Sequence, residues 1–159
     1  MLNFDEREQV VLAIDFGKTT TKIALLHLET NKGVKYFSKQ DDCYSSKITV
    51  YGNGNVNVLG DSKNEDDNKT VGFSSVYSFL DSENTWNVDN QKWNKIDLIA
   101  ATLEEIKDFI LSKISNTKII RTVICLDTSN SIKYKNLFER ASEISGKSKT
   151  EKAEKRSGI

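Results

Sequence analysis

The stretch VVLAIDFGKTTTKIALLHL, residues 10–28, decides how the rest of the sequence is interpreted. Residues 10–16 are apolar except for one aspartate and include several β-branched side chains, which predicts a buried strand. Residues 17–20 then form a turn, and residues 21–28 form a second strand. A helix over residues 19–28 is the competing interpretation, but three successive threonines lose side-chain freedom in a helix. We therefore expect two antiparallel strands joined by a polar turn.

The letters GKTT at residues 17–20 have the spelling of the end of a Walker A loop. That loop needs a glycine, four residues and then Gly-Lys-Ser/Thr, leading from a strand into a helix. The first glycine would stand at position 12, which is Leu12. In addition, the first strand runs directly into Gly17, and the residues after the turn are strand-like. These three departures exclude a Walker A loop.

A different phosphate-binding device fits the same residues. An aspartate at the end of a buried strand, a glycine turn with hydroxyl groups and a returning strand make a hairpin whose amides can point at phosphate oxygens. Asp15 can hold water molecules around Mg²⁺, which prefers carboxylate and water ligands. An ordinary polar β-turn would have a similar sequence, so the residues alone leave both interpretations open.

The composition predicts one domain without a strong electrostatic preference. The chain has 159 residues, enough for one domain of ordinary size. Its 23 basic and 23 acidic side chains cancel, so no net field favours nucleic acid or anionic lipid. No apolar run reaches the roughly 20 residues needed to span a bilayer. The N-terminal residues lack the basic and apolar regions of a signal peptide. We expect a cytoplasmic protein with no nucleic-acid partner and no membrane partner.

The cysteines and the single histidine do not suggest a metal or nucleophile site. Cys43 and Cys125 are far apart in the sequence, and with His27 they are too few for a structural zinc site. Cys125 lies in the apolar run IIRTVICL, which predicts a buried small hydrophobic residue. His27 lies in a strand-like run and is expected to be a structural or edge residue.

The remaining elements follow from hydrophobic spacing and turn residues. Residues 61–70 are expected to form a charged surface loop, and residues 71–80 are expected to form an apolar patch of undetermined type. The two tryptophans are expected to anchor a loop to a small core. In chain order the predicted elements are a strand at 34–37, a hairpin of 47–51 and 55–59, a helix at 97–111, a buried strand at 119–126, and a helix from Ser131 that ends at Gly146.

The spacing LAIDFGKTTTKIAL resembles the N-terminal phosphate-binding hairpin of the actin-like ATPases. Within that superfamily it is most similar to the seventy-kilodalton heat-shock chaperones, whose pattern is Ile-Asp-Leu-Gly-Thr-Thr. Three later segments resemble the same family in the same order: KITVYGNGNVNVLGD, NKTVGFSSVYSFL and TVICLDTSNSIKYKNLFERASEISG. The resemblance covers about residues 10–146.

This resemblance implies an α/β fold: the first lobe of an actin-like (ribonuclease H-like) nucleotide-binding domain, with a mixed sheet and flanking helices. A small subdomain would be inserted at about residues 39–94. Residues 1–9 would be a flexible N-terminus, and the polar residues 147–159 a disordered tail. The implied cofactor is ATP or ADP with Mg²⁺.

Carried over by position, Asp15 would contact the Mg²⁺ through water. The β- and γ-phosphates would be lined by Gly17, Lys18, Thr19 and Thr20.

The sequence departs from the family at three positions. Lys18 replaces the first phosphate-loop threonine, and we hypothesise that it supplies a replacement charge at the phosphates. The family's catalytic lysine falls on Tyr77, or on Val76 after a one-residue slip, and an uncharged side chain cannot stabilise a transferring phosphoryl group in the same way. The proline linked in the family to interdomain signalling is Asp127 here. We therefore assign no catalytic residue.

Three functions are compatible with these residues. The first is an ATP-binding protein of the heat-shock chaperone family, truncated or fragmentary, for which we expect no turnover by the isolated chain because the second lobe would lie beyond residue 159. The second is a non-catalytic scaffold that keeps the first lobe, with a protein partner covering the interlobe face. The third is a fragment of another actin-like ATPase or of a sugar kinase.

Overall fold

The computed structural model describes residues 7–28, 34–37, 43–60 and 69–146. Its main sheet is mixed. In this sheet β10 pairs with β1 in parallel, and every other pairing is antiparallel, in the order β10-β1-β2-β3 with β4 added to β2. The strands are β1 (Glu8–Phe16), β2 (Thr20–His27), β3 (Val34–Phe37), β4 (Tyr44–Ser45) and β10 (Thr117–Cys125).

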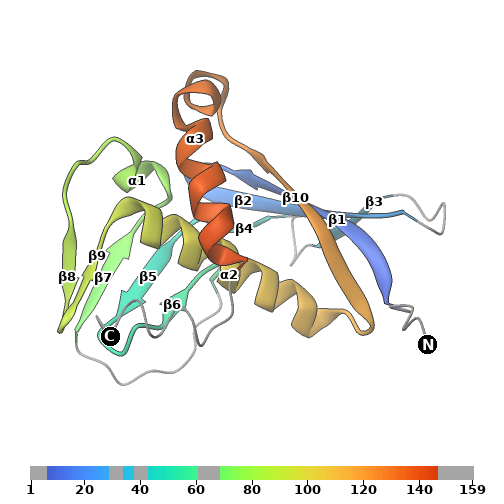
Figure 1. Ribbon diagram of the computed structural model, residues 1–159, viewed down its shortest axis with the longest axis horizontal. Helices are drawn as coiled ribbons and strands as arrows, with labels where there is room; N and C mark the ends of the chain where they lie inside the picture. The colour runs from blue at the N-terminus through green and yellow to red at the C-terminus, as the bar shows by residue number, and fades with distance from the viewer. Residues whose placement is uncertain (1–6, 29–33, 38–42, 61–68, 147–159) are drawn as a thin grey trace.

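The predicted strand pair at residues 10–28 is confirmed. Along β1 the side chains of Val10, Leu12 and Ile14 are fully buried, whereas the residues between them are only partly buried. This alternation shows that one face of the sheet is covered. The covering layer consists of α2 (Lys95–Lys113) and α3 (Thr128–Ser145), which pack against each other and share one core with β1 and β2 (Figure 1).

The helix α2 begins at a capping box. The side chain of Asn94 accepts a hydrogen bond from the amide of Asp97 (2.9 Å), and the Asp97 carboxylate accepts one from the amide of Asn94 (3.4 Å). These bonds satisfy amides that a helix leaves without intrahelical partners. Beyond the cap, the predicted apolar stripe is buried, so the helix predicted at 97–111 is confirmed and extends two residues further at each end. The stripe consists of Ile99, Leu103, Ile106 and Ile110.

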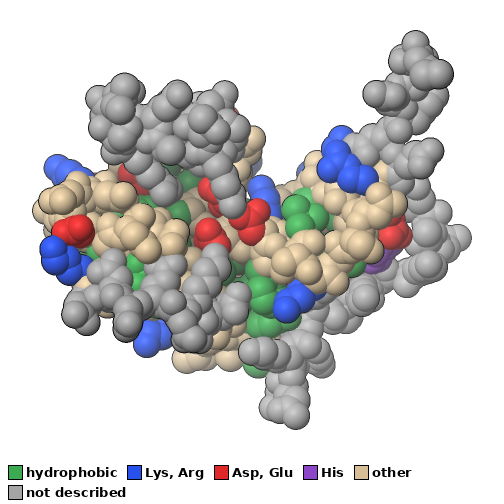
Figure 2. Space-filling model, turned by 90° about the horizontal axis from the view of Figure 1, so that it is seen from below, with side chains coloured by type: hydrophobic (Ala, Val, Ile, Leu, Met, Phe, Trp, Pro, Cys, Tyr) green, Lys and Arg blue, Asp and Glu red, His purple; other side chains and the backbone are tan. Residues whose placement is uncertain are grey.

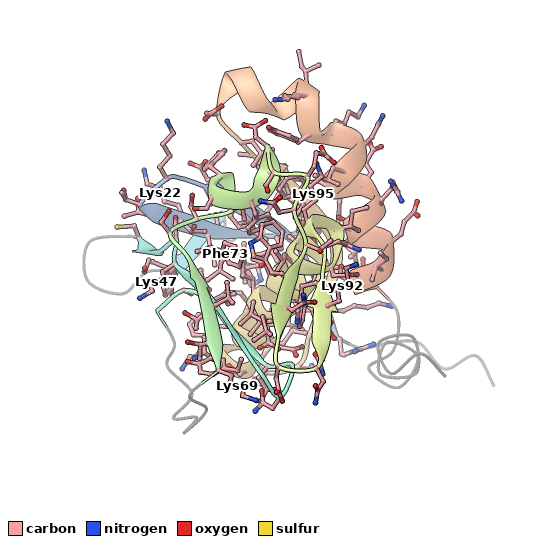
Figure 3. The ribbon with its side chains drawn as sticks, turned by 90° about the vertical axis from the view of Figure 1, so that its left-hand side faces the viewer. Lys22, Lys47, Lys69, Phe73, Lys92 and Lys95 are labelled. Atoms are coloured by element: carbon pink, nitrogen blue, oxygen red, sulfur yellow. The ribbon has the colours of Figure 1, made fainter. Side chains whose placement is uncertain are left out.

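A second part of the structure is a small antiparallel sheet with a short helix and a hairpin. It contains β5 (Ile48–Tyr51), β6 (Val56–Asn57), β7 (Thr70–Phe73), α1 (Tyr77–Leu80), β8 (Trp86–Val88) and β9 (Gln91–Trp93). The predicted hairpin is confirmed as the β5–β6 pair, with Gly54 at φ 88°. Phe73 lies in the core of this part (Figure 3). Its ring contacts Phe79 and Trp86 edge-on, at centroid distances of 5.2 and 5.3 Å.

The sequence predicted that the two tryptophans anchor a loop to a small core, but they lie in a hairpin instead. Trp86 and Trp93 are cross-strand partners in the β8–β9 hairpin. The turn of this hairpin contains Asp89 at φ 56°, a conformation that aspartate tolerates better than most residues. Trp93 is buried, with 2% of its surface exposed.

The strand predicted at 119–126 exists as β10, but the prediction that it is buried is wrong. Ile120 is 44% exposed and Val123 is 41% exposed. Cys125 is also exposed, not buried as predicted. The reason is position: among the described residues β10 has a neighbouring strand on one side only, and the helices cover one face of the sheet. An irregularity between Val10 and Val11 shifts the β1–β10 register beside Ile120.

The boundaries of other predicted segments differ modestly. The strand β1 includes Glu8 and Gln9, which had been placed in a flexible segment 1–9. The helix predicted from Ser131 begins at Thr128 and ends at Ser145, before Gly146. The described residues do not include 1–6, 61–68 and 147–159. Most of the predicted loop and all of the predicted tail therefore lie outside them. A mixed sheet with flanking helices is confirmed, while the actin-like fold, the first-lobe assignment and the subdomain at 39–94 stay predictions.

Candidate functional site

The turn after β1 is held by hydrogen bonds from its own ends and from Ser46. The amide of Gly17 donates to the carbonyl of Thr20 (3.0 Å), which closes the turn. The Ser46 hydroxyl donates to the carbonyl of Gly17 (2.8 Å), and the Ser46 amide donates to the carbonyl of Thr19 (3.0 Å). The Ser46 hydroxyl also contacts the buried hydroxyl of Thr21 (2.8 Å). The turn is therefore fixed to the segment after β4.

Glycine at position 17 is required by the close approach of the turn's own backbone. A Cβ atom at Gly17 would lie 2.3 Å from the carbonyl oxygen of Thr20, well below any real contact distance. A larger residue would force the turn to open.

The outer part of this turn presents polar groups to solvent. The residues Lys18, Thr19 and Thr20 are exposed. Within the described part of the chain, the amides of Lys18 and Thr19 take part in no hydrogen bond. The turn thus offers two backbone donors, two hydroxyl groups and an ammonium group, a set that suits an anion.

Asp15 lies two residues before the turn, on the face of the sheet that the helices do not cover. It is exposed, and its cross-strand neighbours are Lys22 on β2 and Cys125 on β10. The described residues contain no group of three or more histidine, cysteine, aspartate or glutamate side chains that could hold a metal ion. Mg²⁺ usually keeps several waters and needs one or two carboxylates when phosphate supplies further oxygens. An exposed carboxylate beside the turn fits that requirement.

Tyr77 links the ends of the two parallel strands. Its hydroxyl donates to the carbonyl of Phe16 at the end of β1 (2.6 Å) and accepts from the amide of Asp127 just after β10 (3.1 Å). Position 77, where the family resemblance expects a catalytic lysine, therefore does reach the turn. No sequence pattern indicated these two hydrogen bonds, because their partners lie 61 and 50 residues away.

The two positions that the resemblance offered for that lysine have different surroundings. Val76 is only 1% exposed and belongs to the hydrophobic core. Tyr77 is partly exposed and contacts the strand ends. A side chain at position 76 therefore lies in the core, and of these two positions it is 77 whose side chain lies near the end of β1.

The Tyr77 hydroxyl is held in its protonated form. Burial raises the pKa of Tyr77, as do the negative charges of Asp127 and Asp15, whereas the hydrogen bond from the Asp127 amide lowers it. The hydroxyl is therefore neutral at physiological pH and keeps a proton to donate to Phe16. It contributes no positive charge to the site.

The start of α3 is brought close to the turn by the same contacts. The helix begins at Thr128, one residue after Asp127, whose amide is bonded to Tyr77. The first amides of a helix carry partial positive charge and favour anions. The carboxyl ends of β1 and β10, the turn and a helix N-terminus thus lie together at one end of the sheet, the usual place for ligands in α/β folds.

A second polar cluster fixes α3 against α1. The carboxylate of Asp81, directly after α1, accepts hydrogen bonds from Lys133 and from the hydroxyl of Tyr134. These bonds hold the pKa of Asp81 below its usual value, and the bond to Asp81 raises the pKa of Lys133. Because α1 carries Tyr77, this cluster helps to fix the position of Tyr77 relative to α3. No pattern in the sequence indicated this cluster.

The surface agrees with the balanced composition. Figure 2 shows acidic and basic side chains on the same face of the molecule. Within the described ranges, no helix combines the length and the apolar content needed to cross a bilayer.

Comparison with known proteins adds no assignment. No model of a known protein family matches the sequence, and no curated protein matches it.

Proposed function

We propose that this chain binds the phosphates of Mg-ATP or Mg-ADP at residues 17–20, as part of a nucleotide-binding domain of the heat-shock chaperone type. The observation that supports this most is the convergence at one end of the sheet: Tyr77, 61 residues from Phe16 in the sequence, meets the end of β1 beside Asp15 and the turn. The sequence resemblance had assigned these same positions to one site. We further propose that the chain does not turn ATP over by itself.

In this proposal the amides of Lys18 and Thr19 donate to phosphate oxygens, and the threonine hydroxyls add further donors. The ammonium group of Lys18 offsets part of the phosphate charge. Asp15 would hold Mg²⁺ through water, and the ion, when bound, neutralises charge on the phosphates. The rigid attachment of the turn to Ser46 keeps the donors in place, which reduces the entropy lost on binding.

The proposal that the chain does not turn ATP over by itself rests on Tyr77. A lysine at this position would bring a positive charge toward a transferring phosphoryl group, whereas the tyrosine is neutral and its hydroxyl already bridges Phe16 and Asp127. The same observation favours a second function, a non-catalytic scaffold that acts through a protein partner.

The test is a thermal-shift titration with Mg-ATP on the 159-residue chain. A dissociation constant in the micromolar range would stabilise the folded state by about 4 kcal/mol at millimolar nucleotide, and so raise Tm by several degrees. We expect Lys18→Ala and Asp15→Asn each to reduce the shift, and Asp15→Asn to remove most of the difference between Mg-ATP and ATP without Mg²⁺. Lys92→Ala, an exposed lysine on β9, is the matched control and should leave the shift unchanged.

If Mg-ATP produces no shift in the unmodified chain, the nucleotide proposal is wrong and the scaffold function remains. If the shift occurs but Lys18→Ala and Lys92→Ala behave alike, the chain binds nucleotide without using the ammonium group of Lys18. Steady-state phosphate release by the unmodified chain, measured against a no-protein blank, tests the absence of turnover separately.

A further inference from the structure

We infer that Lys22 is a second cation for the nucleotide phosphates, beside Lys18, and that it supplies a positive charge that Tyr77 cannot supply. Lys22 lies on β2, outside the turn at residues 17–20, and the family resemblance did not assign it to the site. The inference rests on the proposed nucleotide site, because it names a further contact to the same ligand. It concerns binding and not turnover.

The pairing of β1 with β2 places Lys22 directly beside Asp15. The two residues are cross-strand partners, and the Cβ atoms of such partners lie about 5 Å apart on one face of the sheet. The residues before and after Lys22, which are Thr21 and Ile23, are buried, whereas Lys22 is exposed. Since side chains alternate along a strand, the side chain of Lys22 lies on the same uncovered face as the carboxylate of Asp15.

Both charged groups are available to a ligand. Within the described part of the chain, neither Lys22 nor Asp15 forms an ion pair or a side-chain hydrogen bond, although the two face each other. Lys22 is therefore not held by Asp15. Three other lysines, by contrast, form ion pairs with carboxylates: Lys69, Lys95 and Lys133.

Lys22 is near enough to the turn to contact a ligand that is held there. Thr20, whose carbonyl closes the turn, comes two residues before Lys22, which is about 7 Å along the strand. The flexible four-carbon stem of lysine lets its ammonium group reach back toward the turn. A phosphate chain that begins at the amides of the turn and extends over the uncovered face would therefore meet both Lys22 and Asp15.

The charges around Tyr77 explain why a cation from β2 is useful. The negative charges of Asp127 and Asp15 both raise the pKa of Tyr77, so both act at this end of the sheet. Negative charge there opposes the binding of a polyphosphate, and the neutral Tyr77 hydroxyl does not offset it. Lys22 lies beside Asp15 and offsets its charge from the neighbouring strand.

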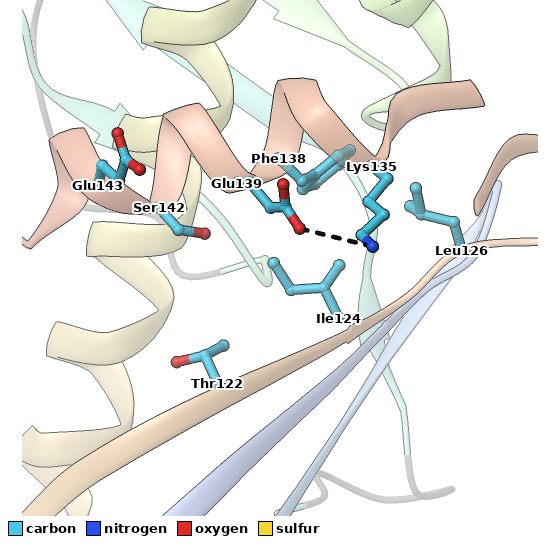
Figure 4. Close-up of a pocket in the computed structure, with 8 residues that line it drawn as sticks. All are labelled: Thr122, Ile124, Leu126, Lys135, Phe138, Glu139, Ser142 and Glu143. Atoms are coloured by element: carbon cyan, nitrogen blue, oxygen red, sulfur yellow. Dashed lines mark ion pairs between the residues drawn. The ribbon is translucent and has the colours of Figure 1, made fainter. Parts of the chain in front are cut away.

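A hollow elsewhere on the sheet suits a polyphosphate less well. It has a volume of about 500 Å³, lies between β10 and α3, and is lined by one lysine, Lys135 (Figure 4). The ammonium group of Lys135 lies 3.9 Å from the carboxylate of Glu139, and Glu143 lines the same hollow. Two carboxylates against one cation disfavour phosphate, so the charges favour the face that carries Lys22.

The experiment measures the dissociation constants of Mg-ATP and of inorganic triphosphate with Mg²⁺ for the 159-residue chain, by isothermal titration calorimetry. We expect Lys22→Gln to weaken both ligands by about fivefold, the upper range for an exposed charge contact. Lys22→Arg keeps the charge and should retain most of the affinity. Lys92→Gln removes an equal charge from the exposed surface of β9, apart from Lys22 in Figure 3, and should change neither constant.

A second measurement separates a direct contact from an effect through Asp15. If Lys22 only neutralised Asp15, Lys22→Gln would free the carboxylate for Mg²⁺, and Mg-ATP would bind as tightly as before or more tightly. A direct contact to phosphate predicts the opposite sign. It also predicts that Lys22→Gln keeps most of its effect when Asp15→Asn is already present. Loss of the effect in that background would overturn the inference.

The failure of this inference can be told apart from the failure of the nucleotide proposal. An unmodified chain that binds neither Mg-ATP nor triphosphate contradicts both. A chain that binds both ligands, with Lys22→Gln and Lys92→Gln alike, contradicts only the role of Lys22. A loss confined to Mg-ATP would place Lys22 at the nucleoside and also overturn the inference. Because Lys22 is exposed, the Tm of Lys22→Gln without ligand should equal that of the unmodified chain.

Discussion

The strands β1 and β10 have the same length, lie side by side in parallel and are both rich in aliphatic residues, yet their burial differs sharply. In β1 the side chains of Leu12 and Ile14 are fully buried. In β10 no aliphatic side chain reaches that level, and Ile120 is 44% exposed. The cause is the number of neighbours: β1 lies between β2 and β10, whereas β10 pairs with β1 alone within the described residues. Aliphatic composition therefore predicts that a segment is a strand, and the position in the sheet decides how much of it is buried.

The largest expected effect tests this comparison directly, because the same isoleucine-to-alanine substitution is made in both strands. Ile14→Ala should reduce the free energy of unfolding by about 3 kcal/mol, because it leaves a cavity in the core. Ile120→Ala should cost less than about 1 kcal/mol, because solvent already reaches that side chain. Urea unfolding followed by circular dichroism measures both. Equal losses in the two variants would mean that the outer side of β10 is covered in solution.

The next effect concerns the turn in which β1 ends. Gly17→Ala should reduce the free energy of unfolding by about 2 kcal/mol, since the new methyl group would overlap the carbonyl of Thr20. Gly72→Ala in β7 is the control, because a methyl group there meets no atom within 4 Å. The same urea titration applies. A Gly17→Ala variant as stable as the control would show that the turn relaxes without cost.

A smaller effect is expected where the ends of β1 and β10 are joined. Tyr77→Phe removes the hydroxyl that bridges Phe16 and Asp127, and should cost about 1 kcal/mol. It should also speed hydrogen exchange at the Asp127 amide. Tyr51→Phe, which removes a hydroxyl that accepts from Asn57 in the small sheet, should leave that exchange unchanged. Unaltered exchange in Tyr77→Phe would contradict the bridge.

The smallest effect is pH-dependent and concerns how α1 is held against α3. Hydrogen bonds from Lys133 and Tyr134 hold the pKa of Asp81 below its usual value. A carboxyl group whose pKa is lower in the folded state stabilises the fold above its unfolded pKa, about 4, and loses that contribution as pH falls through the folded value. The Tm of Asp81→Asn should therefore be slightly below that of the unmodified chain at pH 7, and the difference should vanish in acid. A difference that grows as pH falls would contradict this assignment.

Local sequence signals predicted the elements whose structure depends on local rules. The apolar, β-branched run at residues 10–16, the helical spacing from Ile99 to Ile110 and the turn glycine Gly54 each correspond to an observed strand, helix or hairpin. The β8–β9 hairpin could have been predicted as well. Its turn contains Asp89 followed by an asparagine, residues that accept the left-handed conformation.

The features that escaped prediction depend on contacts between distant segments. The run IIRTVIC has the composition of a buried strand, and its place at the edge of the sheet follows only from which strands it pairs with. The exposure of Cys125 has the same origin. At the candidate site the turn after β1 was predicted, but the bonds of Ser46 and Tyr77 that fix it were not, since they come from segments 29 and 61 residues away. The assignment of the turn to phosphate binding stays a prediction.

The pairing of β1 with β10 has a consequence for how the chain is made. The register joins Glu8 to Thr117, so β1 leaves the ribosome more than 100 residues before its parallel partner. At about 5–20 residues per second, this delay lasts roughly 5–20 s. The pairing of β1 with β2 needs only local sequence and forms much faster than that. During the delay β1 is itself an edge strand, with its aliphatic side chains not yet covered by α2 and α3. A nascent chain whose synthesis is arrested near residue 90 should therefore be prone to association with other chains. This tendency should end once the chain has been made and released as far as residue 145.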